Sequence, residues 1–72
     1  MKTIHKAKPI YKIIYKITDR GETWQPLPIE TNETNHTAAV KKYLKRWRVA
    51  MDLSNKFNFE IIAAPCVGYG FV

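Results

Sequence analysis

The stretch "IYKIIYKI", Ile10 to Ile17, decides the fold, because its tyrosines and lysines recur every four residues. An even spacing keeps register with a β-strand, whereas it drifts around a helix of 3.6 residues per turn. One face of the predicted strand is wholly apolar and aromatic, and it carries Tyr11, Ile13, Tyr15 and Ile17. The other face alternates isoleucine with lysine, from Ile10, Lys12, Ile14 and Lys16. We therefore predict a half-buried strand with its tyrosine face toward the core. Whether the lysine face is bare or covered by the C-terminal residues stays open.

A chain reversal and an edge strand are predicted next. Gly21 can supply the positive φ of a three-residue hairpin loop with a bulge at Asp19-Arg20-Gly21. The following segment, "ETWQPLPIE", contains Pro26 and Pro28, which remove two N–H donors from the same side of a strand. That side must be an unpaired edge, so the second strand pairs with the first through its other side.

A helix is predicted from "TNETNHT" onward, where the hydrophobic period changes to about 3.6. Thr34 or Asn35 can cap its start, and Ser54-Asn55 is the expected stop. At about 100° per residue, one apolar stripe contains Val40, Tyr43, Leu44, Trp47, Ala50 and Met51. The opposite face contains Lys41, Lys42, Lys45, Arg46 and Arg48.

A third strand is predicted for "FNFEIIAA", residues 57–64, which must pair on the free side of the first strand because the prolines block the second. The predicted fold is α+β, with the element order β-β-α-β. It has a three-stranded antiparallel sheet in the order 2-1-3 and one amphipathic helix packed on one face. We expect a single domain over residues 9–72, preceded by a flexible basic arm (1–8) and ending in an apolar tail from residue 65.

The length and composition of the chain limit the kinds of site that it can form. A chain of 72 residues buries one thin core and has little room for a deep pocket. Its single cysteine, Cys66, excludes an internal disulfide and favours a reducing compartment, so we expect the protein in the cytoplasm. No signal peptide is apparent, and the longest uncharged apolar stretch, residues 61–72, is too short for a span of about 20 residues. We expect no membrane association.

Catalytic and metal-binding motifs are not apparent. The strong candidates for a base, nucleophile or soft metal ligand are His5, His36 and Cys66, and they lie in the arm, the helix start and the tail. We predict a solvated His36 and a buried Cys66 that acts as a small hydrophobe. The sequence therefore predicts a protein that is not an enzyme, with no catalytic residue, no metal, no cofactor and no small-molecule substrate.

Charge points to binding. The net charge is +6, with five lysines in residues 1–16 and five cations in residues 41–48. Such blocks favour an acidic protein surface or a nucleic acid as partner, although a solvated helix face shows a similar pattern. The candidate binding residues are Lys41, Lys42, Lys45, Arg46 and Arg48 of the helix, Lys12 and Lys16 of the first strand, and Trp24. Trp24 either contacts a partner or covers the end of the core. We expect a monomer or a weak homodimer.

Two resemblances bear on function. "GYGFV", Gly68 to Val72, resembles the core of the first ribonucleoprotein motif of RNA-recognition domains, whose aromatic side chains stack on RNA bases. A broader resemblance rests on Pro28-Ile29, on Thr37 and Trp47 ten residues apart, on Phe59-Glu60 and on Pro65-Cys66-Val67. These residues are similar to a small phage-encoded inhibitor of bacterial RNA polymerase. That family implies a three-stranded sheet with one helix that binds the polymerase and blocks transcription in the cytoplasm of the bacterial host.

Overall fold

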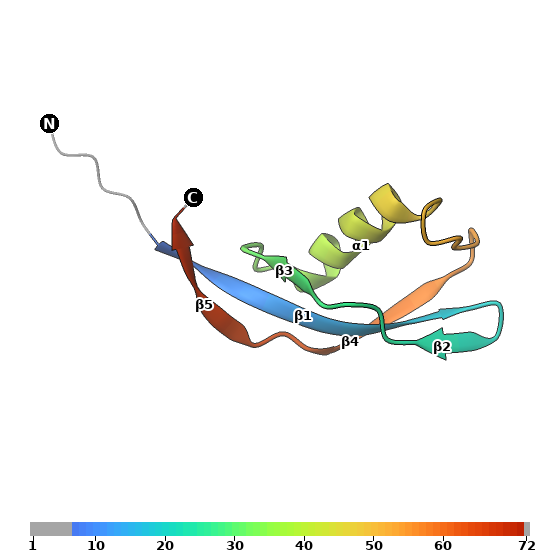
Figure 1. The fold of residues 1–72 in the computed structure, drawn as a ribbon, viewed down its shortest axis with the longest axis horizontal. Helices are drawn as coiled ribbons and strands as arrows, with labels where there is room; N and C mark the ends of the chain where they lie inside the picture. The colour runs from blue at the N-terminus through green and yellow to red at the C-terminus, as the bar shows by residue number, and fades with distance from the viewer. Residues whose placement is uncertain (1–6, 72) are drawn as a thin grey trace, which may run out of the picture.

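The computed structural model describes residues 7–71, in which one long central strand pairs with every other strand. The elements are β1 (Ala7–Asp19), β2 (Glu22–Trp24), β3 (Ile29–Thr31), α1 (His36–Trp47), β4 (Asn58–Ala63) and β5 (Cys66–Phe71) (Figure 1). All four pairings with β1 are antiparallel. The predicted α+β class and antiparallel sheet are confirmed. The predicted strand count is wrong, because the sheet has five strands.

Each side of β1 carries two short strands placed end to end. Ile17 pairs with Trp24 of β2 and with Phe59 of β4, so β2 and β4 lie on opposite sides of β1. Tyr11 pairs with Thr31 of β3 and Cys66 of β5, which separates those two strands in the same way. The predicted second and third segments therefore do flank the first, as expected, but the second is broken into β2 and β3, and the third is followed on its side by a further strand, β5.

Prolines explain both breaks, since a proline has no N–H to donate to a ladder. Pro26 and Pro28 lie in the segment between β2 and β3, which leaves the sheet. Pro65 separates β4 from β5, and its carbonyl oxygen accepts a hydrogen bond of 2.9 Å from the N–H of Lys12. That bond keeps the chain beside β1. The predicted apolar tail is thus a strand, β5, paired with the first residues of β1.

The hairpin between β1 and β2 is tighter than predicted. Asp19 pairs with Glu22, which leaves a loop of only Arg20 and Gly21. Both loop residues have positive φ, 52° at Arg20 and 80° at Gly21. Positive φ at both central residues is the mark of a type I′ turn, whose twist matches that of the flanking strands. The predicted three-residue loop with a bulge is therefore wrong.

The helix begins where the sequence indicates and ends earlier. The side chain of Asn35 accepts a hydrogen bond of 3.0 Å from the N–H of Ala38, which confirms one of the two predicted caps. After Trp47 the chain makes one more turn and closes with Asp52 at a φ of 56°. The N–H of Leu53 then bonds the carbonyl of Arg48 at 3.0 Å. Such a Schellman-type ending stops the helical path at Asp52, ahead of the predicted Ser54-Asn55.

The core lies between the tyrosine face of β1 and α1. Ile13, Tyr15 and Ile17 are fully buried, as are Val40 and Leu44 of the helix. Trp47 and Ala50, predicted for the apolar stripe, are exposed instead, and Trp47 retains 42% of its accessible surface. The start of α1 lies close to β1 and its end rises away from the sheet (Figure 1). Met51 and Leu53 fill the space that opens beneath it.

The helix covers one face of the sheet and only part of its length. Thirteen strand residues extend about 43 Å, whereas a twelve-residue helix extends about 18 Å. Figure 1 shows β5 and the beginning of β1 reaching beyond the helix. Because β5 lies beside β1, it does not fold over Ile10, Lys12, Ile14 and Lys16, and no other element within residues 7–71 covers that face.

The predicted arm has a different boundary. Ala7 and Lys8 already belong to β1, and residues 1–6 lie outside the described residues. Within residues 7–71, α1 is the one α-helix, and it is neither long nor apolar enough to cross a membrane.

Candidate functional site

The outer face of α1 carries cations that are not neutralised within the fold. Lys41, Lys45 and Arg46 are exposed and have no carboxylate partner among the described residues. Lys42 differs, since its Nζ lies 3.4 Å from Oε1 of Glu33. Arg48 is half-buried and donates a hydrogen bond to Oδ1 of Asn55. The five predicted helix cations thus divide into three that have no ion-pair partner among the described residues and two that contact Glu33 or Asn55.

Lys12 and Lys16 do not join these cations. They alternate with the buried residues of β1, so they lie on the sheet face opposite to α1. Lys12 is exposed, and the Nζ of Lys16 forms an ion pair of 2.9 Å with Oε2 of Glu60 on β4. The two predicted basic regions are therefore separated by the thickness of the sheet, and they do not form one continuous surface.

A cleft of about 560 Å³ opens between α1 and β4. Its floor is apolar, because Phe57, Phe59 and Ile61 are only half-buried there. Phe59 and Ile61 pair with Ile17 and Tyr15, so their side chains lie on the helix-covered face of the sheet. The helix does not extend over them completely. The remaining lining residues are Thr37, Lys41, Asn55 and Asn58.

The cleft runs beside an unpaired strand edge. β4 pairs with β1 alone, and no backbone hydrogen bond in the described part of the chain reaches its other edge. Backbone N–H and C=O groups of a strand point alternately to its two sides, so half of those in β4 face away from β1. Lys41 is the one residue of the cleft that the sequence predicted for binding. The apolar floor was missed because a strand prediction for residues 57–64 does not say how much of that strand the helix covers.

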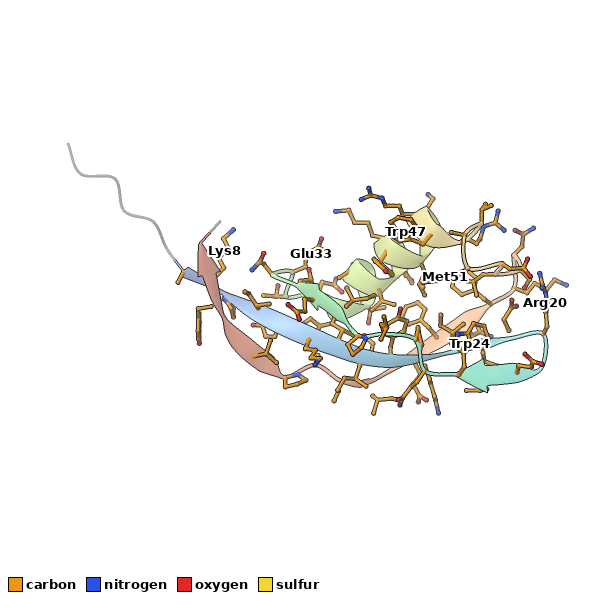
Figure 2. The ribbon with its side chains drawn as sticks, viewed as in Figure 1. Lys8, Arg20, Trp24, Glu33, Trp47 and Met51 are labelled. Atoms are coloured by element: carbon orange, nitrogen blue, oxygen red, sulfur yellow. The ribbon has the colours of Figure 1, made fainter. Side chains whose placement is uncertain are left out.

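Trp24 lies at a different end of the molecule. It ends β2 opposite Ile17, which places its side chain on the helix-covered face, and 38% of its surface is exposed. With Met51 it lines a cleft of about 380 Å³ next to the hairpin. Figure 2 shows Trp24 and Met51 near one another between β1 and the turn that follows α1. Trp24 thus lies partly exposed beside Met51, and both of its predicted roles, contact with a partner and cover over the end of the core, stay predictions.

The candidate catalytic and metal-binding side chains that the structure describes do not form one site. The ring of His36 packs against that of Tyr11, with 4.6 Å between centroids, and its Nε2 is buried with no hydrogen-bond partner. The predicted solvated His36 is therefore half-buried. Cys66 is exposed, contrary to the prediction, because β5 extends beyond the helix. His5 lies outside the described residues. Within residues 7–71, no three side chains of His, Cys, Asp or Glu gather as metal ligands would.

Residues 68–71 of the ribonucleoprotein-like motif lie in β5, where Tyr69 is 71% exposed, and Val72 lies outside the described residues. RNA-recognition domains carry this motif on their third strand, whereas here its described residues belong to the fifth strand, after α1. Comparisons of the chain with protein-family models, with curated proteins and with solved structures return no match.

Proposed function

We propose that this chain is a small non-catalytic regulatory protein that docks on an acidic surface of a larger protein. The observation that carries the proposal is the combination of unpaired cations on α1 with the neighbouring cleft, whose floor is apolar. Lys41 belongs to both features. Protein interfaces combine a desolvated apolar centre with a polar rim, and the floor of the cleft and the cations of α1 supply these two parts.

The distribution of charge favours a protein over a nucleic acid as partner. A nucleic-acid backbone is bound along a continuous basic track, which requires several cations on one surface. Here Lys12 and Lys16 lie on the face opposite to α1, and Lys16 is neutralised by Glu60. Lys42 is likewise paired with Glu33. The three free cations of α1 suit a compact acidic patch better than a long polyanion.

Bacterial RNA polymerase is the first partner to test, since the sequence resembles phage-encoded inhibitors of that enzyme. On this proposal the protein acts in the cytoplasm of a bacterial host and inhibits or modulates the machine on which it docks. The docking face is α1 with the adjacent cleft, and electrostatic attraction by α1 speeds the encounter.

Nucleic-acid binding is the second candidate, and one observation favours it. No acidic residue interrupts residues 41–48, and Trp47 is exposed beside Arg46, whose guanidinium carbon lies 5.5 Å from the ring centroid. Arginine and an exposed aromatic ring together offer a stacking surface for a base. This reading predicts an affinity that falls steeply as salt rises.

One experiment separates the two candidates. The purified chain is tested by biolayer interferometry against immobilised bacterial RNA polymerase and against single- and double-stranded oligonucleotides, at about 50 mM and about 200 mM salt. We expect saturable binding to the polymerase, and a loss of at least about tenfold when Lys41→Glu and Lys45→Glu are combined. The matched control is Lys12→Glu, an exposed charge reversal on the opposite face, which should change the affinity by less than about twofold. Binding to oligonucleotides without binding to the polymerase would favour the second candidate.

A further inference from the structure

We propose that the cleft between α1 and β4 receives an extended acidic segment of the partner, which adds to the free edge of β4 as a further strand. The inference rests on the proposed function, because it states how the partner docks. Three features carry it: the open edge of β4, the apolar floor, and the sign of the charge around the cleft.

The edge of β4 suits strand addition. The strand has six residues, pairs with β1 on one side only, and contains no proline. Its one charged residue, Glu60, pairs with Lys16 on the face opposite to α1, and therefore does not point into the cleft. In strand addition, main-chain hydrogen bonds supply affinity while alternate side chains enter pockets and supply specificity.

The apolar floor of the cleft determines which side chains the added strand must carry on its helix-facing side. A strand added to β4 lies about 4.8 Å from it, so its side chains on the helix side reach the space over Phe59 and Ile61. The volume of about 560 Å³ is within the usual range of roughly 300–1,000 Å³ for ligand pockets. Both floor residues are half-buried apolar side chains. The added segment therefore places apolar side chains at every second position.

The charge around the cleft specifies an acidic segment. Lys41 is the one charged residue among those that line it. Lys45 lies one helical turn further along α1, and Lys56 stands between the lining residues Asn55 and Phe57 in the sequence. All three lysines are exposed and have no ion-pair partner within the described residues. In the added segment, the positions between the apolar ones point to the face opposite to α1. Acidic side chains at helix-facing positions on either side of the apolar ones would meet this field, whereas basic ones there would be repelled.

The other strand edges fit this segment less well. On the other side of β1, β2 and β3 have three residues each and are separated by a stretch that contains Pro26 and Pro28. The outer edge of β5 is unpaired, but Cys66–Phe71 contains no charged residue and would give an acidic segment no preference over a neutral one. In the experiment below, protection at β5 would show that the segment adds to that edge instead.

The probe is a short synthetic peptide, blocked at both ends, whose helix-facing positions carry valine in the middle and glutamate at either end, with threonine at the positions between. Two control peptides accompany it: one with lysine in place of glutamate, and one with the same side chains and N-methylated backbone amides. Amide hydrogen exchange of the full chain is followed residue by residue by NMR, with and without peptide. We expect the outward amides of Asn58–Ala63 to exchange at least about tenfold more slowly with the acidic peptide, with β5 unchanged. Both control peptides should fail to bind.

Charge-reversal variants test whether Lys41 attracts the acidic peptide. Lys41→Glu should weaken binding of the acidic peptide by about tenfold, whereas the matched reversal Lys12→Glu should leave it within about twofold. Equal binding of the N-methylated peptide, protection that appears at β5, or no binding of the acidic peptide would each overturn the inference. These results do not test the proposed function. The proposed function is contradicted instead if the unmodified chain does not bind the polymerase.

Discussion

Asp19 at the end of β1 accepts two hydrogen bonds from Ser54, one from its backbone N–H at 2.9 Å and one from its hydroxyl. The carboxylate is buried, with 6% of the residue exposed, although it lies directly before the hairpin turn. The two residues are 35 positions apart in the sequence. Their contact joins the connection between α1 and β4 to the hairpin between β1 and β2. It therefore holds the end of the helical region against the sheet.

Asp19 should make the fold sensitive to acid. The hydrogen bonds from the Ser54 hydroxyl and N–H, with a smaller contribution from Arg20, lower the pKa of the Asp19 carboxyl below its ordinary value of 3.8. A depressed pKa in the folded state contributes stability above 3.8 that is lost as pH falls through the folded value. Urea unfolding at pH 7 and at successively lower pH should show this loss.

The matched variants for that measurement are Asp19→Asn and Asp52→Asn. The first keeps the side-chain size and removes the titration, so its stability should fall less steeply below pH 3.8 than that of the unmodified chain. The second removes an exposed carboxylate that forms a surface pair of 3.3 Å with Arg20, and it should leave the steep loss in place. Identical acid profiles for Asp19→Asn and the unmodified chain would contradict the assignment.

Tyr15→Phe should leave the fold as stable as before, or more stable by about 1 kcal/mol. The Tyr15 side chain is fully buried, and its hydroxyl has no hydrogen-bond partner, so removing it relieves a desolvation cost. Tyr15→Ala is the size control and should cost about 3–5 kcal/mol through the cavity that it leaves. Chemical denaturation of both variants checks this. A large loss in Tyr15→Phe would mean that the hydroxyl is bonded.

Tyr15 should also make the stability of the fold decrease at alkaline pH. Burial raises the pKa of Tyr15 from 10.0 to about 12, with a smaller contribution from Tyr43. A raised folded-state pKa contributes stability that is complete below pH 10.0 and is lost as pH rises toward 12. Ultraviolet absorbance of the phenolate should show one tyrosine that ionises about two pH units later than an ordinary one. That late step should be absent in Tyr15→Phe.

Gly21→Ala should destabilise the hairpin by about 1–2 kcal/mol, because a φ of 80° is strained for a residue with a Cβ atom. Gly68→Ala is the matched control, since its added Cβ meets no atom within 4 Å and its φ is not in the left-handed region. It should be neutral or stabilising by up to about 1 kcal/mol, as alanine loses less backbone entropy than glycine in a strand. Thermal unfolding of the two variants provides the comparison, and equal effects would refute the assigned turn.

Trp24→Ala should lower stability by about 1–2 kcal/mol and leave partner binding unchanged. Its side chain lies on the helix-covered face opposite the buried Ile17, beside Met51 and outside the cleft between α1 and β4, so its removal exposes apolar surface. Calorimetric unfolding gives the first quantity and polymerase binding gives the second. If Trp24→Ala lost affinity while keeping its stability, the docking face would have to include the hairpin end.

Much of the fold follows from local patterns. The alternation in β1 predicted its buried face correctly, because side chains of a strand point to opposite sides whatever surrounds them. Asn35 was a predicted cap because its side-chain oxygen can bond a free N–H of the first turn. The antiparallel placement of strands on both sides of β1 followed from the position of the prolines. These features depend on residues within a few positions of one another.

What the sequence did not predict depends on contacts between distant residues. The exposure of Trp47 results from the tilt of α1 away from the sheet, which helical periodicity does not contain. β5 was taken for a tail because two glycines and a preceding proline weaken its strand pattern, and pairing with β1 overrides that weakness. The cleft arises because the helix leaves Phe59 and Ile61 partly uncovered. Only Lys41 among the cleft residues could be selected from charge.

The role of β1 as the common partner of all other strands determines how the chain can fold. Only the pairing with β2 is local, whereas the contact of Tyr11 with Cys66 joins residues that are far apart in the sequence. Such distant pairings must close long loops before they gain any stability, which slows folding. No pair of strands that excludes β1 forms a ladder of its own in residues 7–71. No fragment that lacks β1 should therefore hold sheet structure, and folding should be a single all-or-none event.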